Sequence, residues 1–271
     1  RFARGARVAT VHDLSLYRLP WAVRPDARRA LAAGLDRTFL DADLILTLSR
    51  AVRDELVERG LSPARLRPIH LGPGQIEEGD DDGPLPERVP ERFALHVGTL
   101  EPRKNLPVLL AAWRLLRERR SDTPPLVLCG GFGWHAEELR GLVAEGERDG
   151  SVVVTGYAEP SALRALYRRA ALVAVPSLYE GFGLTVAEAM AAGVPLVVSD
   201  IPVLREVAGD AALYAPTGRA DLWAEGVGQL LDDAALRERL IARGQERRGL
   251  FDWRTTAEET ARAFRDAAER R

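Results

Sequence analysis

Five short apolar runs, separated by helix-like segments, recur between residues 93 and 199. The runs occupy 94–98, 126–129, 152–156, 172–175 and 195–199, and helices are predicted between them at about 106–119, 136–147, 161–169 and 184–192. Apolar runs that alternate with helices in this way are typical of a parallel sheet covered by helices on both faces. The sequence therefore predicts an α/β fold with a doubly wound sheet, whose ligands bind beyond the carboxyl ends of the strands.

A smaller set of strand and helix patterns precedes this unit. Strands are expected at 8–12 and 44–49 and helices at 25–40 and 50–58, with Ser49 as a cap for the second helix. The stretch "LRPIHLGPG" adds a short strand and a turn. These elements are too few for a complete doubly wound sheet, and the chain enters a strand almost directly. We therefore expect an incomplete first domain whose opening strands are missing.

The acidic, proline-rich stretch "EEGDDDGPLPERVPE" separates the two units and has no apolar period. Such a composition is typical of a linker or an exposed loop. The C-terminal region reads as helical, with an interruption at "GLFDWRT". We predict a partial N-terminal domain over 1–76, a linker over 77–91, a second domain over 92–250, and a helix over 251–271 that returns toward the first domain.

The composition is that of a globular protein and excludes several classes of function. Hydrophobic residues make up 46% and charged residues 29% of the chain, no apolar stretch approaches a membrane span in length, and the opening lacks a signal-peptide profile. The single cysteine, Cys129, excludes an internal disulfide and a cysteine-built metal site, and is expected as a small buried thiol. No basic run interleaved with aromatic residues indicates nucleic-acid binding. A cytoplasmic location follows by default.

The charge is unevenly distributed along the chain. Residues 1–75 hold 13 Arg against 8 acidic residues, although the whole chain has a net charge of −2. This basic excess could attract phosphate-bearing partners or the inner face of a membrane, and scattered solvated arginines explain it equally well. Peripheral membrane association therefore stays open as an expectation.

One loop stands out by its choice of cation. Of the 38 basic residues 37 are Arg, and the only Lys, Lys104, precedes the only Asn, Asn105, in "VGTLEPRKNL". This loop follows the first strand of the second domain, so Arg103 and Lys104 can face the ligand crevice. A compact ammonium beside a guanidinium would bind a diphosphate. The alternative is a pair of surface charges at a helix start, where the helix dipole disfavours cations.

The stretch "PSLYEGFGLTVAEAMAAG" joins an apolar strand to a helix through a glycine-rich loop. The N–H groups of the first helical turn have no partner within the helix, so this junction can bind an anion. Glu180 in the loop and Glu188 in the helix could each accept hydrogen bonds from sugar hydroxyls. Alternatively, Glu188 could simply interact favourably with the positive end of the helix dipole. Paired carboxylates could instead be the acid and base of a hydrolase. A hydrolase, however, has no use for a phosphate cradle between them.

Other motifs have plainer interpretations. The stretch "CGGFGWHAEE" resembles a dinucleotide fingerprint, but the next strand ends in Thr155 and Gly156 without the acid that would hold a ribose, so a tight turn suffices. His12 and Asp13 end the first strand, where a histidine can donate to a sugar hydroxyl or to the backbone. The other histidines lack metal-ligand spacing, and His96 is expected in the core.

Together these stretches resemble family 4 of the retaining glycosyltransferases. "EGFGLTVAEAMAAGVPLVVSD" resembles its donor-site motif of two glutamates with seven residues between them, and "HVGTLEPRKNLPVLLAAW" and "VATVHDLSLYRLP" are similar to its mannosyltransferase branch. The similarity covers nearly all of residues 7–265. It implies a GT-B-like architecture of two Rossmann-like doubly wound parallel-sheet domains, the N-terminal one incomplete. It also implies that no metal ion or other cofactor is required.

The resemblance implies roles for individual residues. Arg103 and Lys104 would neutralise the donor diphosphate, while Glu180 would bind the donor sugar near the reacting carbon. His12 would reach the sugar from the opposite domain. The other donor contacts are expected from Gly98, Thr99, Gly156, Tyr157, Phe182, Gly183, Leu184, Thr185 and Glu188.

Within that set the resemblance implies that different residues contact the ribose, the nucleobase, and the sugar with the phosphates. Glu188 would hold the ribose, and Gly156 with Tyr157 would border the nucleobase. The backbone amides of 182–184 would contact the sugar and the phosphates. Many relatives carry Arg where this chain has Thr99, so one phosphate contact is expected to be absent.

The implied reaction is transfer of a hexose, mannose in the first instance, from a GDP- or UDP-sugar to a hydroxyl of a glycan or lipid-linked acceptor, with retained anomeric configuration. The leaving phosphate would take the acceptor's proton, which agrees with the lack of an evident general base. Two alternatives stay open, a non-catalytic nucleotide-sugar-binding scaffold and a sugar phosphorylase. Without its opening strands, the chain is expected to bind donor poorly or to be inactive.

Overall fold

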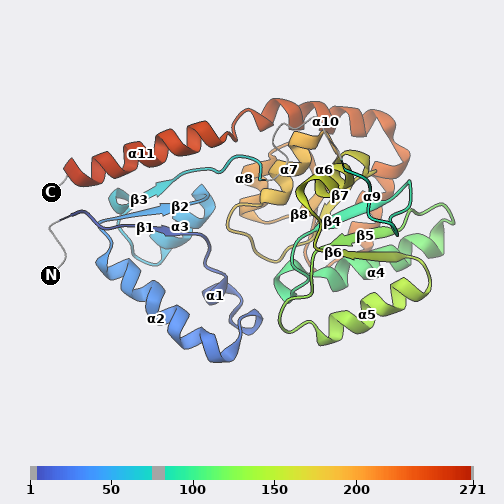
Figure 1. The fold of residues 1–271 in the computed structure, drawn as a ribbon, viewed down its shortest axis with the longest axis horizontal. Helices are drawn as coiled ribbons and strands as arrows, with labels where there is room; N and C mark the ends of the chain where they lie inside the picture. Colours follow the sequence, from blue (N-terminus) through green and yellow to red (C-terminus); the bar gives the residue numbers. More distant parts are fainter. Residues whose placement is uncertain (1–4, 75–82, 270–271) are drawn as a thin grey trace.

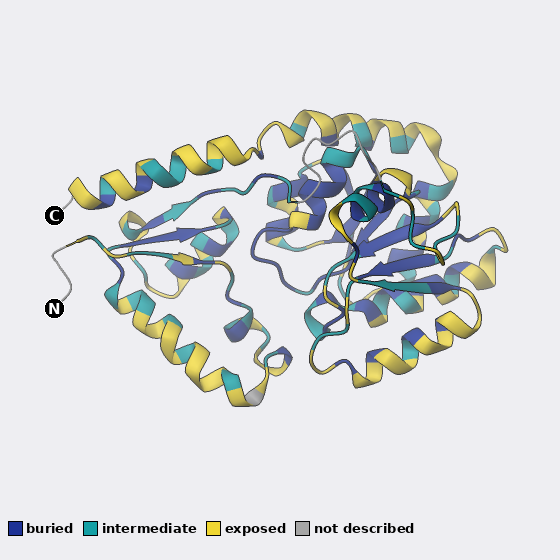
Figure 2. Cartoon of the chain, viewed as in Figure 1, coloured by how far each residue is buried: buried dark blue, intermediate teal, exposed yellow. Residues whose placement is uncertain are grey.

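A computed structural model describes residues 5–74 and 83–269 and shows two lobes, each built on its own parallel sheet (Figure 1). The strand order is β1-β2-β3 in the first lobe and β6-β5-β4-β7-β8-β9 in the second. Figure 2 shows the strands mostly buried and the outward helix faces exposed. Both lobes are α/β units with parallel sheets, so the predicted fold class is confirmed.

The first lobe surrounds its three-stranded sheet with short connections and helices. It contains β1 (Val8–Val11), β2 (Leu44–Thr47), β3 (Leu66–Pro68), α1 (Ser15–Arg18), α2 (Pro25–Asp41) and α3 (Arg50–Glu58), with 3-10 turns at Pro20–Ala22 and Pro63–Arg65. β2 is the central strand, and all its residues are buried, which explains its unbroken apolar composition. Ser49 caps α3 as predicted, because its side chain accepts a 3.2 Å hydrogen bond from the Val52 N–H.

The second lobe is larger and more regular. Its strands are β4 (Ala94–Val97), β5 (Leu126–Cys129), β6 (Val152–Gly156), β7 (Val173–Val175), β8 (Leu196–Ser199) and β9 (Ala212–Ala215). Its helices are α4 (Leu106–Arg119), α5 (Glu137–Arg148), α6 (Pro160–Arg169), α7 (Leu184–Ala192), α8 (Pro202–Ala208), α9 (Ala220–Asp232) and α10 (Ala234–Arg248), with a 3-10 turn at Pro102–Lys104. The chain starts in the middle at β4, builds to one edge, and returns to β7. Ligands of doubly wound folds bind at this switch between β4 and β7.

Two helical layers enclose the larger sheet. On one face α4 and α9 contribute Trp113 and Trp223 to a core cluster, and on the other α6 and α7 contribute Tyr167 and Val186 to a second. All four side chains are at most 1% exposed. Burying aromatic side chains of this size supplies much of the hydrophobic stabilisation of a lobe. The strands between the two layers are therefore apolar on both faces, which produced the runs seen in the sequence.

The predicted elements of the second lobe are present within a few residues of their expected bounds, but the sequence did not indicate α8 and β9. α8 is short, and β9 is an edge strand of sequence ALYA whose two central residues are only partly buried, so neither produces a long apolar run. The helical C-terminal region also has a second break, where Asp233 caps α10 by accepting a 2.8 Å hydrogen bond from the Leu236 N–H.

The last helix, α11 (Trp253–Glu269), leaves the second lobe and lies along the sheet of the first (Figure 1). Ala263 and Ala267 pack against Leu44 and Leu46 of β2. The predicted linker, 77–91, lies partly outside the described residues, and its described part contains neither helix nor strand. Over the described chain, none of the helices combines the length and the apolar character that crossing a membrane demands.

A carboxylate of α8 connects the two lobes. Glu206 accepts hydrogen bonds from the N–H groups of Arg50 (2.7 Å) and Ala51 (2.8 Å) at the start of α3, and lies 2.6 Å from His70 Nε2. An acid at a helix N-terminus satisfies donors that the helix leaves open and interacts favourably with its dipole. One side chain of the second lobe therefore caps a helix of the first.

We expect Glu206→Ala to lower the free energy of unfolding by about 2 kcal/mol, because it leaves the N–H groups of Arg50 and Ala51 without their acceptor while Ser49 still caps Val52. Burial alone would raise the pKa of Glu206, but the hydrogen bonds from His70, Arg50 and Ala51 lower it below its ordinary value of 4.5. The ionised form therefore stabilises the fold above pH 4.5, and this contribution declines as the pH falls below that value.

Urea unfolding of wild type and Glu206→Ala between pH 3.5 and pH 7 would measure both effects. The difference in unfolding free energy should be full at the upper end and shrink on acidification. Glu225→Ala is the matched control, because Glu225 is exposed on α9 within the second lobe. Equal stability of Glu206→Ala and the control at pH 7 would contradict the capping interpretation.

Candidate active site

A cavity of about 800 Å³ lies between the lobes, at the carboxyl ends of β4 and β7. The first lobe contributes the residues after β1, β2 and β3, and the second lobe contributes the loops after β4, β5, β6 and β7. The lining residues are His12, Asp13, Leu48, Leu71, Gly74, Val97, Gly98, Thr99, Arg103, Lys104, Cys129, Gly130, Gly131, Tyr157, Ala158, Leu163, Glu180, Gly181, Phe182, Gly183, Leu184, Thr185, Glu188 and Trp253. The site therefore occupies the switch point of the larger sheet and is closed by the smaller lobe.

Two cations converge on one carboxylate in this cavity. Lys104 Nζ lies 2.7 Å from Glu180 Oε1, and Arg103 Nη1 lies 2.9 Å from Glu180 Oε2. Ser177 donates its hydroxyl to Glu180 Oε1 at 2.7 Å. Lys104 and Glu180 are buried, with 8% and 7% of their surface exposed. The carboxylate therefore fixes the directions of both cations.

The backbone explains why the chain's only Asn stands in this loop and why a glycine lies under the Lys104 side chain. Asn105 adopts the left-handed conformation (φ 53°), which asparagine tolerates better than most residues, and donates its side-chain amide to the Pro176 carbonyl at 3.1 Å and the Thr217 carbonyl at 2.8 Å. The stem of Lys104 passes over Gly98, where an added Cβ would come within 3.1 Å of Lys104 Cε. Gly98 has φ 144°, so glycine is favoured there on both grounds.

The electrostatics of the cluster keep Glu180 ionised. Burial alone would raise its pKa, but the charges of Lys104 and Arg103 and the hydrogen bonds from Lys104 and Ser177 lower it to about 2. A carboxyl with this pKa cannot donate a proton near neutral pH. This lowering is opposite to the raised pKa that the acid of a hydrolytic pair needs.

The start of α7 opens into the same cavity. Gly183 is the N-cap with φ 95° and has no side chain to close the first turn, so the helix start is shaped to receive an anion. The two lobes meet next to it, because a Cβ at Gly181 would lie 2.1 Å from the His12 carbonyl oxygen and Ser49 Oγ donates to the Gly181 carbonyl at 2.8 Å. Lys104 and the α7 N-terminus thus border one cavity, as the diphosphate hypothesis requires.

Glu188, in the second turn of α7, is held by a tyrosine that the sequence did not single out. The phenol of Tyr167 donates to Glu188 Oε2 at 2.6 Å, and Tyr167 is fully buried. Burial raises the pKa of Tyr167 well above its ordinary value, and the negative charge of Glu188 raises it further. The phenol therefore stays protonated and can only donate to the carboxylate.

The structure brings together nearly all of the predicted site residues. Twelve of the thirteen line the cavity: His12, Gly98, Thr99, Arg103, Lys104, Tyr157, Phe182, Gly183, Leu184, Thr185, Glu180 and Glu188. The exception is Gly156, which stands at the end of β6 and accepts a 2.8 Å hydrogen bond from the Gly130 N–H. Tyr157 is 73% exposed at the cavity rim, and His12 is exposed directly after β1.

The remaining lining residues show what the sequence could not reveal. Leu48, Leu71 and Gly74 come from the first lobe and Trp253 from the start of α11, where its indole donates to the Pro73 carbonyl at 3.1 Å. Their place in the site depends on how the lobes dock, and no local pattern signals that. Only the position of Leu48, near the carboxyl end of the strand predicted at 44–49, could have indicated it.

Two residues that the sequence assigned to the core are indeed buried. His96 is fully buried in β4, bonds to the Ala174 carbonyl through Nδ1 at 3.0 Å, and has its pKa lowered to about 4 by burial. Cys129 is 4% exposed, and burial raises its pKa, which disfavours the reactive thiolate. Neither behaves as a nucleophile or a catalytic base.

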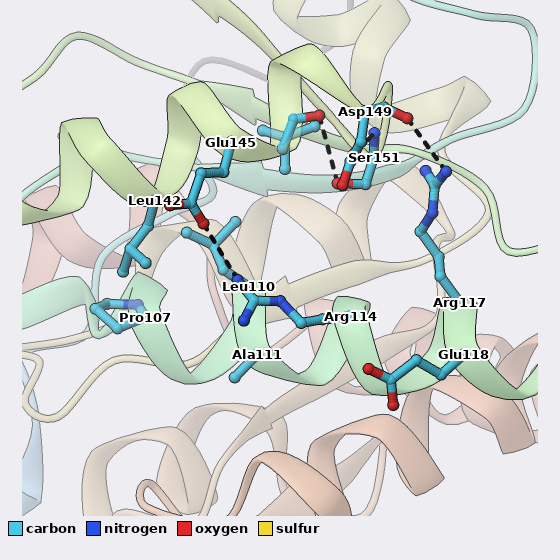
Figure 3. Close-up of a pocket in the computed structure, with 12 residues that line it drawn as sticks. Pro107, Leu110, Ala111, Arg114, Arg117, Glu118, Leu142, Glu145, Asp149 and Ser151 are labelled. Atoms are coloured by element: carbon cyan, nitrogen blue, oxygen red, sulfur yellow. Dashed lines mark hydrogen bonds and ion pairs between the residues drawn. The ribbon is translucent and has the colours of Figure 1, made fainter.

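A second hollow, of about 550 Å³, lies between α4 and α5 (Figure 3). Three of its charged residues are engaged with one another or through the backbone: Arg114 lies 3.3 Å from Glu145, and Arg117 donates to the Asp149 carbonyl at 3.2 Å. It borders the amino end of β6, the edge of the sheet opposite to that used for ligands. We therefore assign the candidate site to the cavity between the lobes.

The chain is similar to known glycosyltransferases over most of its length. Residues 78–247 match the family described as "Glycosyl transferases group 1". The chain is 35% identical over 265 residues to O-antigen chain mannosyltransferase B of Escherichia coli, covering 95% of this chain and 70% of that protein. It is 30% identical to the E. coli serotype-specific mannosyltransferase WbdA, covering 82% of this chain but 26% of the relative. The chain thus spans about a quarter of that larger protein.

Solved structures show the same architecture. Sucrose-phosphate synthase from Thermosynechococcus elongatus superimposes with a TM-score of 0.76 at 25% identity, covering 96% of this chain and 67% of that one. Anabaena Alr3699/HepE, crystallised with UDP-glucose, gives a TM-score of 0.75 at 19% identity, covering 96% and 72%. The fold is that of the GT-B glycosyltransferases.

Proposed function

The chain belongs to the glycosyl transferases group 1 family, and on that premise we propose that it transfers a hexose, mannose in the first instance, from a nucleoside diphosphate sugar. The acceptor is a hydroxyl of a glycan or of a lipid-linked saccharide, and the anomeric configuration is retained. The mannosyltransferases among its relatives support the choice of sugar. As a member of this family the chain is an enzyme of the glycosyltransferase type.

One observation supports the proposal above all others. Lys104 and Arg103 converge within 3 Å of Glu180 in the cavity onto which the N-terminus of α7 opens. Two cations and a helix N-terminus together offer the positive charge that a diphosphate needs, without calling for a metal ion. The first lobe lies across the cavity and supplies the wall from which an acceptor can approach.

The proposed chemistry uses this positive charge on the leaving group. The bond between the sugar's anomeric carbon and the diphosphate oxygen breaks while a bond forms from the acceptor hydroxyl oxygen to that carbon. The proton of the acceptor hydroxyl passes to the leaving phosphate oxygen, so no separate base is needed. Lys104 and Arg103 stabilise the negative charge that develops on the diphosphate, which is where electrostatic catalysis is most effective.

Glu180 contributes in two ways under this proposal. It holds both cations in position, and its negative charge would lie where positive charge develops on the sugar ring. Glu188, next to the same helix start, would accept from the ribose. Peripheral binding at the inner face of a membrane would bring a lipid-linked acceptor to the cavity mouth.

A donor panel tests the proposal. Calorimetry with UDP, GDP and their glucose and mannose conjugates, all in EDTA, should show micromolar binding of one nucleotide series. Full-length protein with the matching sugar donor should then release nucleoside diphosphate in the presence of a mannose-containing acceptor. Binding without transfer or hydrolysis would favour a scaffold, a dependence on inorganic phosphate would favour a phosphorylase, and loss of binding in EDTA would contradict the metal-free site.

A further inference from the structure

Tyr167 has no part in the reaction scheme, yet it is placed to control one end of the donor site. It lies on α6, is fully buried, and donates to Glu188 Oε2 at 2.6 Å. Glu188 itself borders the cavity, so the tyrosine contacts a site residue from behind. A hydrogen bond from a protonated donor to a carboxylate is among the stronger and more directional contacts in a protein interior.

The other oxygen of Glu188 faces the opposite lobe. A Cβ added to Gly74 would lie 2.2 Å from Glu188 Oε1, and Gly74 also lines the cavity. The carboxylate is thus held at Oε2 by Tyr167, while Oε1 lies against Gly74 at the border of the cavity. Because each carboxylate oxygen can accept more than one hydrogen bond, Glu188 keeps acceptor capacity in this orientation.

We infer that Tyr167 is a positioning residue for the donor's ribose: its phenol holds the Glu188 carboxylate in the orientation that accepts a ribose hydroxyl. The inference rests on the proposed function and goes one step further, because it assigns to a residue outside the cavity the preference for a ribonucleotide over a deoxyribonucleotide. Tyr167 is not catalytic, since it contacts neither the cavity nor the reacting atoms.

The test measures how much affinity is lost when a ribose hydroxyl is removed from the nucleotide, and not only the affinity itself. Calorimetry is run with UDP and GDP and with their 2′-deoxy and 3′-deoxy counterparts on wild type and Tyr167→Phe. In wild type, removal of the contacted hydroxyl should weaken binding about tenfold or more. In Tyr167→Phe the ribonucleotide should bind about tenfold more weakly. The deoxy penalty, meaning the loss of affinity when the contacted ribose hydroxyl is removed, should fall below about threefold. A merely structural change would instead weaken the binding of all the nucleotides alike and leave this penalty unchanged.

Tyr214→Phe is the matched control. Its phenol donates to the Gly209 carbonyl at 2.6 Å in the same lobe, outside the cavity lining, so the same atom is removed without touching Glu188. The control should keep the wild-type affinities and the wild-type deoxy penalty. A deoxy penalty that is absent from wild type, or that is unchanged in Tyr167→Phe, would overturn the inference.

Gly74→Ala provides a second route in case Tyr167→Phe does not fold. The added methyl group would displace Glu188 Oε1 from the other side, while Tyr167 still holds Oε2. The loss of affinity on removal of the ribose hydroxyl should therefore again become small. A wild-type penalty in Gly74→Ala would contradict the inference independently. If wild type binds neither UDP nor GDP, the proposed function falls and the inference falls with it; if it binds with an unaltered penalty in the variants, only the inference falls.

Discussion

Replacing Glu180 with Gln is expected to lower kcat about 100- to 1000-fold and the free energy of unfolding by about 3 kcal/mol. The substitution keeps the shape of the side chain and removes its charge. Lys104 and Arg103 would then be left in a largely buried cluster without their shared counter-ion. Breaking a buried ion pair from one side is costly because the remaining charge has lost both water and partner.

The same substitution should have the opposite effect on binding of the diphosphate. In the free protein the Glu180 charge repels an incoming anion, so its removal is expected to tighten UDP or GDP binding several-fold while transfer is lost. Calorimetry and steady-state kinetics on one preparation would separate the two effects. A Glu180→Gln protein that binds nucleotide more weakly and still transfers sugar would contradict the counter-ion interpretation.

Acidification provides an independent check on Glu180. Because its pKa is lowered from 4.5 to about 2, the ionised carboxylate stabilises the folded state above pH 4.5 and loses this contribution as the pH falls toward 2. The stability difference between wild type and Glu180→Gln should therefore be constant from pH 5 to pH 8 and shrink below pH 4.5. Glu101→Gln serves for comparison, because the Glu101 carboxylate contacts Arg103 at 2.9 Å, whereas the Lys104 ammonium contacts Glu180. Its effect on transfer should be smaller.

The second lobe was predictable from sequence because its information is local. Each apolar run between β4 and β8 forms its own strand, and the sequence order of strands and helices leaves few ways to pack them. The residues after those strands then meet at one edge, which is why Lys104, Glu180 and Glu188 could be proposed as one site before their contacts were known. The edge strand β9 was missed because its two central residues are only partly buried, so it lacks the fully buried apolar run that marks the inner strands.

The contacts that complete the site depend on pairs far apart in the sequence. In the sequence Tyr167 is indistinguishable from an ordinary core residue of α6, and nothing local indicates that its hydroxyl reaches Glu188. Gly74 and Trp253 become part of the cavity only because the first lobe and α11 close over the second lobe. The sequence suggested that Glu180 would accept from sugar hydroxyls or face positive charge at the anomeric carbon, and it did not indicate that both its oxygens contact cations.

Lys104 should tolerate no substitution, not even by arginine. Lys104→Met removes one of two cations and is expected to weaken nucleotide binding about 10- to 100-fold and to lower kcat/KM about 1000-fold. Lys104→Arg keeps the charge, but its planar, larger head group must fit where the stem passes over Gly98 and the ammonium lies 2.7 Å from Glu180. We expect it to lose at least about 100-fold in kcat/KM, because small displacements of a catalytic group are costly.

Arg117→Lys is the control for the exchange of cations, since Arg117 is exposed on α4, and it should leave activity unchanged.

The double variant Lys104→Met with Glu180→Gln distinguishes a coupled pair from two independent residues. If the charges stabilise one another, removing both should cost about 2 kcal/mol less than the sum of the single costs, because neither is left buried alone. Additive losses in stability, or full activity of Lys104→Arg, would contradict the proposal that Glu180 positions the Lys104 ammonium for the diphosphate.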